Sequence, residues 1–182
     1  ILKFDLSSLP GSYKIVANIP YYLTNHLLRM LCETQHKPVI AVLLMQKEVA
    51  QRVCAAPGDM SLLSVSVQLS YEVSLGLVIP AKLFEPPPKV DSQVIILKRR
   101  TQPLFPGCHP GNKEVGEFFR VVKAGFSQRR KTLLNSLSAG LHLTKEETLK
   151  LLSGAKIQPA IRPQELSLVN WYSLYRQLQN DK

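Results

Sequence analysis

The sequence predicts an α/β fold in its first hundred residues, followed by a small all-helical domain. Short apolar runs alternate with segments of helical spacing over residues 1–100, which is typical of strands and helices that alternate along the chain. A loop rich in proline and glycine follows at residues 101–112 and indicates a linker between domains. The patterned segments of residues 113–182 all have helical spacing, and most of the positive charge lies there.

The first half is predicted to begin with two strand–helix units. Residues 13–18 are an apolar run that ends at a proline turn, which indicates a buried strand. Residues 24–33 have leucines at helical spacing, and Thr24 is the expected N-cap. Residues 38–45 are continuously apolar, as in a central strand covered on both faces, and residues 47–53 predict a helix. This alternation indicates a parallel sheet.

The next segments are less regular. Residues 61–70 fit either a buried helix or a strand, and we favour the helix. Residues 73–79 and 93–97 predict two strands, joined by a loop at residues 80–92. Two strands connected in this way predict an antiparallel edge on a mostly parallel sheet.

The second half is predicted to contain four helices. Thr144 and Glu147 have the spacing of a capping box, in which each side chain binds the backbone N–H of the other residue. Ser167 is the expected cap of the last helix. The predicted helices are residues 113–126, residues 130–138, a third that follows Thr144, and a last one from Ser167 to residue 178.

The net charge of +10 is unevenly distributed. Residues 1–97 carry +1 and residues 98–182 carry +9, so one half is expected to dock on a polyanion such as RNA. The alternative is an ordinary solvated basic surface. Membrane association is less favoured, because no basic segment has the apolar face and bulky anchors of an interfacial helix.

The cysteines indicate whether a metal site is present and which cellular compartment is expected, and the first residues indicate whether the sequence is part of a longer protein. Cys32, Cys54 and Cys108 are isolated, and the adjacent pair Cys108 and His109 is poorly suited to chelating one metal, so no metal site is predicted. Unpaired thiols are typical of a reducing cytoplasm. The first residues lack an initiating Met and the pattern of a signal peptide, so we expect the sequence to be part of a longer protein.

A first candidate for chemistry is residues 18–21, with the sequence N-I-P-Y, directly after the first predicted strand. Ligands of open α/β sheets bind beyond the carboxyl ends of the strands. A planar amine is a poor nucleophile. The Asn18 amide oxygen and the Pro20 carbonyl are acceptors that can hold its hydrogens and aim its lone pair at an electrophile. Tyr21 offers an aromatic face for a base. The alternative is an ordinary strand-to-loop turn.

A second candidate is residues 84–92, with the sequence F-E-P-P-P-K-V-D-S. Three successive prolines predict a stiff, extended loop that presents Phe84. An aromatic ring opposite Tyr21 would sandwich a base, and such stacking is worth roughly 1–3 kcal/mol per base. That is comparable to the cost of unstacking the base. The alternatives are a polyproline ligand for another protein and a rigid connector.

A third candidate is residues 126–133, with the sequence F-S-Q-R-R-K-T-L, predicted to open a helix in the basic half. Its three adjacent cations could bind phosphates, or they could form a solvated face or resemble a nuclear-localisation signal. Apolar residues at helical spacing around them are expected to face the core, namely Phe119, Val122, Phe126, Leu133 and Leu134.

Together the three motifs resemble those of the small-subunit ribosomal RNA adenine dimethyltransferases. That family has an N-[IL]-P-Y loop after the fourth strand of a Rossmann-like methyltransferase sheet. It also has an F-x-P-x-P-x-V-x-S loop between the last two strands and an F-x-x-R-R-K-x-L stretch in a small helical domain. The R-P-Q-E-L-S sequence at residues 162–167 is similar too. The resemblance covers nearly the whole chain and implies the C-terminal half of such a sheet followed by the helical domain.

The resemblance implies transfer of two methyl groups from S-adenosylmethionine to the exocyclic amine of adenines in small-subunit ribosomal RNA, during ribosome maturation. Asn18 and the Pro20 carbonyl would hold the amine, and Asn18 would border the donor. Tyr21 and Phe84 would flank the adenine. The methylated amine is cationic and sheds its proton readily, so no strong general base is needed. The expected RNA-binding residues are Lys89, Arg129, Arg130 and Lys131.

The sequence departs from the family pattern at its start. The glycine-rich donor loop, the acidic ribose-binding residue and a Gly-Asp pair are absent, so we expect weak donor binding and no activity for this chain alone. In the family's fold the strand that leads into N-I-P-Y pairs with the sheet's first strand. Without that neighbour, residues 13–18 would be an exposed apolar edge, which predicts self-association or marginal stability.

Three other functions stay open. A large-subunit ribosomal RNA adenine methyltransferase shares the first two motifs, although P-P-P-K-V-D-S and R-R-K favour the small-subunit group. A protein-glutamine methyltransferase has a similar N-P-P-Y loop, but the Phe84 loop and the basic half argue against a peptide substrate. An RNA-binding assembly or transcription factor could descend from the same enzymes, although an intact N-I-P-Y argues against lost activity.

Overall fold

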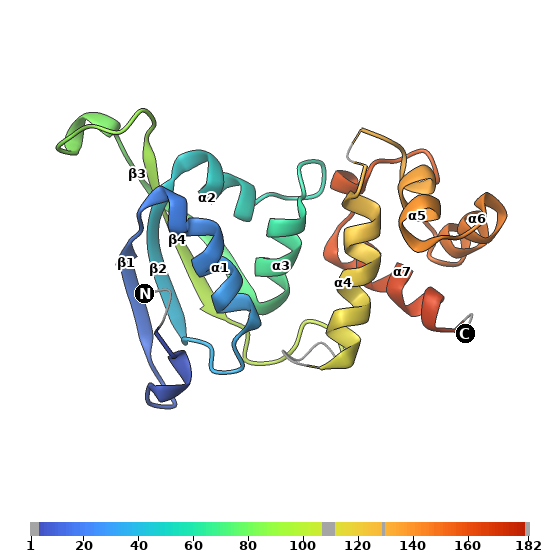
Figure 1. Ribbon diagram of the computed structural model, residues 1–182, viewed down its shortest axis with the longest axis horizontal. Coiled ribbons are helices and arrows are strands. Elements are labelled where there is room, and N and C mark those ends of the chain that lie inside the picture. Colours follow the sequence, from blue (N-terminus) through green and yellow to red (C-terminus); the bar gives the residue numbers. More distant parts are fainter. Residues whose placement is uncertain (1–3, 107–111, 129, 181–182) are drawn as a thin grey trace. The chain divides into compact units, whose positions relative to one another are not determined.

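The computed structural model describes residues 4–106, 112–128 and 130–180 (Figure 1). Three residues singled out in the sequence lie outside these ranges, namely Cys108, His109 and Arg129. Among the helices that the structure describes, none combines the length and the hydrophobicity that spanning a bilayer requires.

The chain divides into two compact units, which we describe separately. The first comprises the chain up to residue 54 together with residues 66–104, and the second comprises residues 55–65 and the chain from residue 105 onward. The second unit therefore includes a segment from the first half, which the sequence pattern did not predict. Its contacts are specific: the backbone N–H groups of Gly58 and Met60 both donate to the Gln164 carbonyl, at 2.9 and 3.1 Å.

A four-stranded sheet forms the centre of the first unit, in the spatial order β1-β2-β4-β3. The strands are β1 (Lys14–Asn18), β2 (Ile40–Gln46), β3 (Tyr71–Ile79) and β4 (Ser92–Arg99). β1 and β2 are parallel, whereas β4 is antiparallel to both β2 and β3. β1, β2 and β3 therefore run in the same direction, and β4 is the one antiparallel strand among the four that the structure describes. This agrees with the predicted mostly parallel sheet with an antiparallel pair at one edge, where β4 returns from its loop and inserts between β2 and the edge strand β3.

The helices of the first unit begin and end close to where the hydrophobic spacing predicts. They are α1 (Thr24–Glu33), α2 (Lys47–Val53) and, starting in residues grouped with the second unit, α3 (Leu62–Ser70). The predicted helix at residues 61–70 is thus confirmed. Three short 3-10 helices are described in this unit: η1 (Leu6–Ser8) precedes β1, η2 (Tyr21–Leu23) lies between β1 and α1, and η3 (Ala81–Leu83) lies between β3 and β4.

The core of the first unit lies between the sheet and the helices that cover one of its faces (Figure 1). Alternate residues of β2, namely Ala41, Leu43 and Met45, are fully buried, and the residues between them are partly exposed. Only one face of β2 is completely covered within the described chain, whereas the continuous apolar run predicted burial on both. From α1, Leu27, Leu28 and Leu31 complete this core.

The predicted N-cap of α1 is wrong. Leu23 is the N-cap, and Thr24 already has helical backbone angles, because η2 leads directly into the helix. The Thr24 hydroxyl is buried and has no hydrogen-bond partner among the described residues. A side-chain cap requires an extended backbone at the capping residue, and the preceding 3-10 turn prevents that here.

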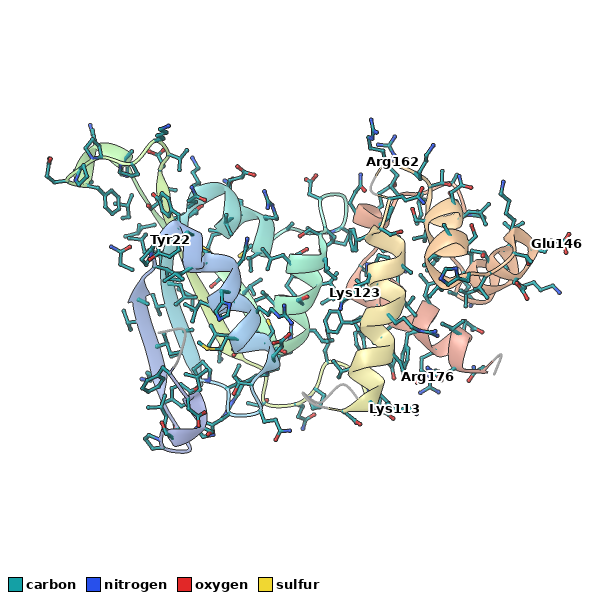
Figure 2. The ribbon with its side chains drawn as sticks, in the orientation of Figure 1. Tyr22, Lys113, Lys123, Glu146, Arg162 and Arg176 are labelled. Atoms are coloured by element: carbon teal, nitrogen blue, oxygen red, sulfur yellow. The ribbon has the colours of Figure 1, made fainter. Side chains whose placement is uncertain are left out.

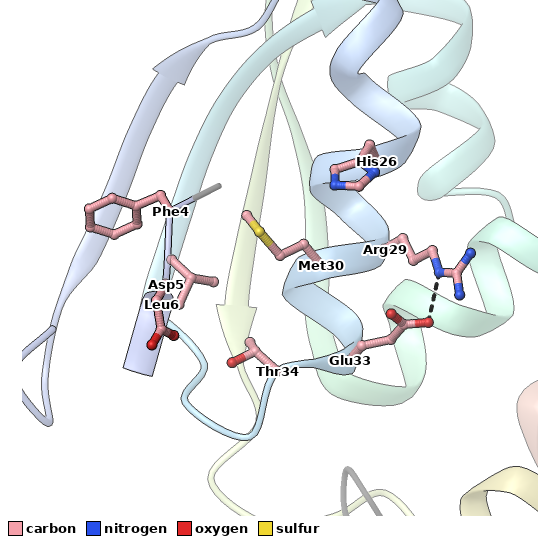
Figure 3. A pocket seen from close by; sticks show the side chains of 8 residues that line it. All are labelled: Phe4, Asp5, Leu6, His26, Arg29, Met30, Glu33 and Thr34. Atoms are coloured by element: carbon pink, nitrogen blue, oxygen red, sulfur yellow. Dashed lines mark hydrogen bonds and ion pairs between the residues drawn. The ribbon is translucent and has the colours of Figure 1, made fainter. Parts of the chain in front are cut away.

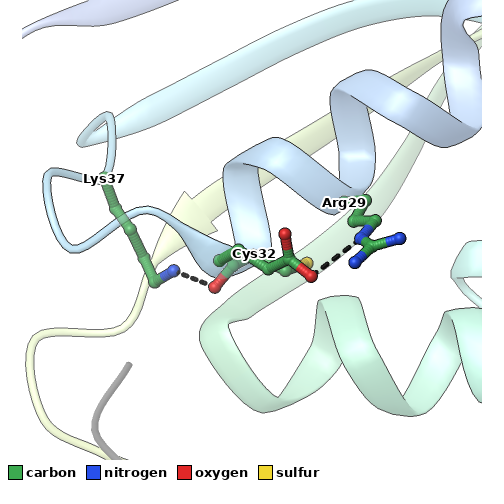
Figure 4. A network of polar contacts seen from close by, with 4 residues as sticks. Arg29, Cys32 and Lys37 are labelled. Carbon is green, nitrogen blue, oxygen red and sulfur yellow. Dashed lines mark hydrogen bonds and ion pairs between the residues drawn. The ribbon is translucent and has the colours of Figure 1, made fainter. Parts of the chain in front are cut away.

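A buried lysine satisfies the C-terminus of α1 (Figure 4). The Lys37 ammonium, only 6% exposed, donates hydrogen bonds to the carbonyls of Leu31, Cys32 and Thr34. The last carbonyls of a helix lack intrahelical donors and carry partial negative charge, so a cation there is favourable. Burial lowers the pKa of Lys37 to about 8, and burial also raises the pKa of the Cys32 thiol to about 11.

The second unit is helical apart from its connections. Its helices are α4 (Lys113–Phe126), α5 (Leu133–Leu141), α6 (Lys145–Gly154) and α7 (Leu168–Asn180), with the short 3-10 helix η4 (Pro163–Glu165) before α7. The capping box of Thr144 and Glu147 is confirmed, with the Thr144 hydroxyl accepting from the Glu147 N–H at 3.1 Å. Ser167 caps α7, because its hydroxyl accepts from the Asn170 N–H at 3.2 Å.

The core of this unit is built around Trp171 of α7, which is fully buried. Its ring lies 5.3 Å from that of Phe126, and an added Cβ on Gly125 would come within 2.3 Å of it. Helix α4 can therefore approach α7 this closely only where its surface has no side chain.

Candidate functional site

The N-I-P-Y loop begins where β1 ends. The N–H of buried Ile19 donates to the Leu44 carbonyl of β2 at 3.1 Å, so the chain stays beside β2 for one residue beyond the strand. The next step is a tight turn, in which the Leu23 N–H donates to the Pro20 carbonyl at 2.9 Å. This bond uses one of the two lone pairs of the Pro20 oxygen and leaves the other for a ligand.

Asn18 is the last residue of β1 and is exposed. Its side-chain amide makes no hydrogen bond within the part of the chain that the structure describes. Because Asn18 lies at the carboxyl end of a strand in an open sheet, its amide is available to a ligand rather than engaged in holding the loop. The amide presents one acceptor oxygen and two N–H donors.

Tyr21 is held at both ends of its side chain. Its backbone belongs to η2, and its phenol oxygen lies 3.0 Å from the hydroxyl of Ser92, the first residue of β4. The phenol also lies at 3.5 Å from the Val90 carbonyl, a longer and weaker contact. Ser92 is 2% exposed and is paired through the backbone register to β2 and β3. The ring is therefore anchored to the first residue of β4, an interior strand of the sheet.

Phe84 lies in the loop between β3 and β4, which projects beyond the end of the sheet (Figure 1). The loop is not a uniformly extended polyproline segment, because η3 forms its first part and the Glu85–Pro86 peptide bond is cis. The Phe84 N–H donates to the Ala81 carbonyl at 3.1 Å, which ends η3. The Asp91 carboxylate accepts from the Ala81 N–H at 3.0 Å, and the Asp91 carbonyl accepts from the Lys47 N–H of α2 at 3.0 Å.

One cavity brings the four predicted catalytic residues together. It has a volume of about 310 Å³, and the residues that line it are Asn18, Ile19, Pro20, Tyr21, Phe84, Glu85, Pro86, Pro88 and Ser92. Two segments that are far apart in the chain thus supply its walls. An acceptor-rich edge from Asn18 and Pro20 adjoins two aromatic residues, which suits a flat base that bears an amine.

A larger cavity of about 570 Å³ lies beside α1 (Figure 3). Figure 3 shows an ion pair between Arg29 and Glu33 at its rim, with 2.7 Å between the charged atoms, and the apolar side chains of Leu6 and Met30. None of the predicted site residues lines it. The size of a cavity says less about chemistry than its donors and acceptors, so we assign the candidate site to the smaller one.

The predicted RNA-binding residues are placed differently from the sequence-based expectation. Lys89 is exposed in the β3–β4 loop but does not line the cavity. Arg130 and Lys131 are exposed in the turn that connects α4 and α5, and they do not form the first turn of a helix. Helix α5 begins only at Leu133. Arg129 lies outside the described residues.

The start of α5 has a physical cause in the second unit. The Leu133 N–H donates to the Ile161 carbonyl at 2.7 Å, and the Leu134 N–H donates to the Pro159 carbonyl at 3.3 Å. These bonds satisfy two of the first-turn N–H groups, which are therefore not free to bind an anion. Several other cations of this unit are labelled in Figure 2, among them Lys113, Lys123, Arg162 and Arg176.

Asp91 and Ser92 are the residues that sequence reasoning missed. Both belong to the quoted F-E-P-P-P-K-V-D-S motif, but no role was predicted for either. The partner of Ser92 lies 71 positions away in the sequence, and no spacing rule reveals a contact of that kind.

Comparison with known proteins identifies a family whose sequences match this chain. Residues 1–180 match the family of ribosomal RNA adenine dimethylases. The chain is 42% identical over 177 residues to the ribosomal RNA small subunit methyltransferase A of Dehalococcoides mccartyi, covering 96% of this chain and 59% of that relative. Among solved structures, the 23S rRNA methyltransferase ErmE is similar with a TM-score of 0.72 at 23% identity, covering 98% of this chain and 69% of that one. A dimethyladenosine transferase from Plasmodium falciparum has a TM-score of 0.73 at 24% identity, covering 92% and 67% of the two chains. At such identities the structural likeness supports the fold alone.

Proposed function

Because the chain belongs to the ribosomal RNA adenine dimethylase family, we propose that its protein transfers two methyl groups to the exocyclic amine of adenines in small-subunit ribosomal RNA. The chain spans 59% of the length of the relative from Dehalococcoides, so the proposal concerns the complete protein. The observation that carries it is the cavity in which Asn18, Pro20, Tyr21 and Phe84 meet.

In this proposal Asn18 and Pro20 hold the amine. The Asn18 amide oxygen accepts one N–H, and the free lone pair of the Pro20 carbonyl accepts the other. Two acceptors in the plane of the base favour a nitrogen lone pair that points out of that plane, toward an electrophile. The amine nitrogen would become cationic on taking the methyl carbon, whose bond to the sulfur of the donor would break to leave a neutral thioether, and the nitrogen would then release a proton to water. Fixed dipoles of this kind stabilise charge where it develops, at little reorganisation cost.

Tyr21 and Phe84 contribute stacking. A base must leave its helix before its amine can enter the cavity, which costs a few kcal/mol. Stacking on aromatic rings returns roughly 1–3 kcal/mol per base. Because any base has a flat face, these two residues supply affinity, and the acceptors of Asn18 and Pro20 select the amine.

The methyl donor in this family is S-adenosylmethionine, which supplies an electrophilic methyl group when it is bound. The exposed Asn18 amide, with no partner in the described chain, fits a residue that borders such a donor. The glycine-rich sequence expected for the remainder of the donor site is absent from this sequence. Weak donor binding and inactivity of this chain alone are therefore part of the proposal, as is a cytoplasmic location.

The test is methyl transfer from labelled S-adenosylmethionine by the complete protein. The substrates are small ribosomal subunits without the modification, deproteinised large-subunit RNA, and a glutamine-containing peptide, with dimethyladenosine read by mass spectrometry. We expect dimethyladenosine only in small-subunit RNA. Methylation of large-subunit RNA or of the peptide alone would contradict the proposal, and RNA binding without methylation would favour a non-enzymatic RNA-binding factor.

The second unit is proposed to dock the RNA, with Lys89 of the first unit as a further contact. Replacing both Arg130 and Lys131 with alanine should weaken binding of small-subunit RNA and flatten its salt dependence. A log–log plot of affinity against salt loses about 0.7–0.9 of slope per phosphate contact, because fewer counterions are released. Fluorescence anisotropy with labelled RNA at several salt concentrations measures this slope.

The matched control removes the same charge elsewhere in the second unit. Lys145 and Lys150 are exposed on α6, and their double alanine variant should retain the wild-type slope. If the two double variants lose equal slope, the RNA is attracted by net charge and not by the turn between α4 and α5.

Self-association is proposed for the chain as it stands. β1 is an edge of the described sheet, and Val16 on it is 82% exposed. Exposed strand edges with apolar side chains tend to pair with other chains. We expect sedimentation velocity to show a concentration-dependent dimer, and Val16→Lys to shift it toward monomer. A wild-type monomer up to high micromolar concentration would refute this.

A further inference from the structure

Two adjacent residues at the start of β4 each hold a different wall of the candidate site. Ser92 contacts Tyr21, at 3.0 Å between the two hydroxyl oxygens. Asp91 accepts the Ala81 N–H at 3.0 Å and so fixes the start of η3, the short helix that Phe84 directly follows. The distance between Tyr21 and Phe84 is therefore set by the two adjacent residues Asp91 and Ser92.

The support for this dipeptide is rigid. Ser92 is 2% exposed, and its backbone pairs with Gln46 of β2 on one side and Ile79 of β3 on the other. The Asp91 carbonyl accepts the Lys47 N–H, the first of α2. A hydroxyl on a central strand can hold a phenol in one place, because its own backbone is fixed by hydrogen bonds on both sides.

The Tyr21 ring needs this support. Its backbone is fixed by η2, but a tyrosine side chain can still rotate about two bonds. The contact with Ser92 removes that freedom at the far end of the ring. A ring held in advance loses less conformational entropy when a base stacks on it, and a site held close to its productive geometry reacts faster.

We propose that Ser92 is a positioning residue that orients Tyr21, and that Asp91 does the same for Phe84. Together they would set the width of the slot, by which we mean the space between the two aromatic rings that receives the adenine. This inference rests on the proposed function and adds to it the residues that define the width of the slot. Ser92 acts through Tyr21, because its hydroxyl lies 3.0 Å from the Tyr21 hydroxyl at the wall of the cavity. Its removal should slow the reaction of bound RNA without weakening RNA docking.

The test is a double-mutant cycle in the complete protein, with Ser92→Ala, Tyr21→Phe and the double variant. Tyr21→Phe keeps the stacking ring and removes only the hydroxyl. Each single variant should lower kcat about fivefold, the effect of one lost neutral hydrogen bond, with KM for the RNA unchanged. The double variant should also lose about fivefold in total, because the two changes remove the same contact.

Ser64→Ala is the matched control, because Ser64 is also fully buried and its hydroxyl accepts the Ser61 N–H, outside the cavity. It should lower the melting temperature and leave kcat unchanged. A second readout is the fluorescence of 2-aminopurine at the target position, which stacking quenches and which should be brighter in Ser92→Ala. If Ser92→Ala does not fold, Tyr21→Phe alone still has to show the fivefold loss of kcat.

The outcomes distinguish a failure of the positioning role from a failure of the proposed function. Wild-type kcat in Ser92→Ala or in Tyr21→Phe would refute the positioning role, and so would losses that multiply to about 25-fold in the double variant. A wild-type protein that methylates no RNA would instead refute the proposed function, and the positioning role with it.

Discussion

Replacing Asn18 with alanine is expected to lower methyl transfer by the complete protein by about 10²- to 10³-fold, the effect of removing one preorganised polar group from an active site. The side chain makes no contact that holds the loop within the described chain, so the fold should be unaffected. RNA affinity should be nearly unchanged, because docking is assigned to the basic turn of the second unit. Phe84→Ala should cost less, since Tyr21 still offers one stacking face.

The comparison with Asn18→Asp makes the test specific. A carboxylate keeps an acceptor at the same place but loses the amide N–H groups, so Asn18→Asp should retain more activity than Asn18→Ala. Single-turnover methylation under saturating RNA, with a parallel binding measurement, separates turnover from docking. Near-normal turnover of Asn18→Ala would contradict the amine-orienting role, and equal loss in both variants would contradict the importance of the acceptor.

Replacing Gly125 with alanine should destabilise the second unit by about 1–3 kcal/mol or more, the usual cost of overpacking a core. The new Cβ would lie 2.3 Å from Trp171 Cη2 and 2.8 Å from Cζ3, and Trp171 is fully buried. A rigid indole cannot give way as a flexible side chain can, so α4 or α7 must shift. Urea unfolding followed by Trp171 fluorescence reports this directly, because the chain contains one tryptophan.

Gly116 provides the control on the same helix. It is exposed, and a Cβ there would meet no atom within 4 Å. Gly116→Ala should therefore stabilise the protein by about 0.5–1 kcal/mol through helix propensity alone. If Gly125→Ala is as stable as Gly116→Ala, the close approach of α4 to Trp171 does not exist in solution.

Helices and helix caps formed where the hydrophobic spacing and the capping residues predicted the same element. The bounds of α1, α2 and α4 match the hydrophobic spacing, and the capping box of Thr144 and Glu147 and the Ser167 cap formed as predicted. Local signals failed at Thr24 and at the basic triplet. In the first case the preceding 3-10 turn determined the backbone of the capping residue. In the second, hydrogen bonds from the Leu133 and Leu134 N–H groups to the Ile161 and Pro159 carbonyls place the start of α5 beyond Arg130 and Lys131.

The residues of the candidate site could be predicted from the sequence, but their meeting in one cavity could not. Asn18, Pro20, Tyr21 and Phe84 were recognised because each lies in a short motif whose chemistry can be reasoned from residue types. That the four line one cavity required the β3–β4 loop to lie beside the end of β1, and this depends on β4 inserting next to β2. The spatial order of strands is a long-range property, and hydrophobic periodicity carries no information about it.

The types of the secondary-structure elements, the uneven charge, the motifs and the family could all be derived without a structure, because they depend on neighbouring residues and their chemistry. Tertiary structure alone decided which distant residues meet: the hydroxyls of Tyr21 and Ser92, the carboxylate of Asp91 and the backbone of η3, and Gly125 and Trp171. Such contacts are made by packing elements that lie far apart along the chain. Their geometry depends on the balance of burial and hydrogen bonding over the whole unit, which no local stretch of sequence contains.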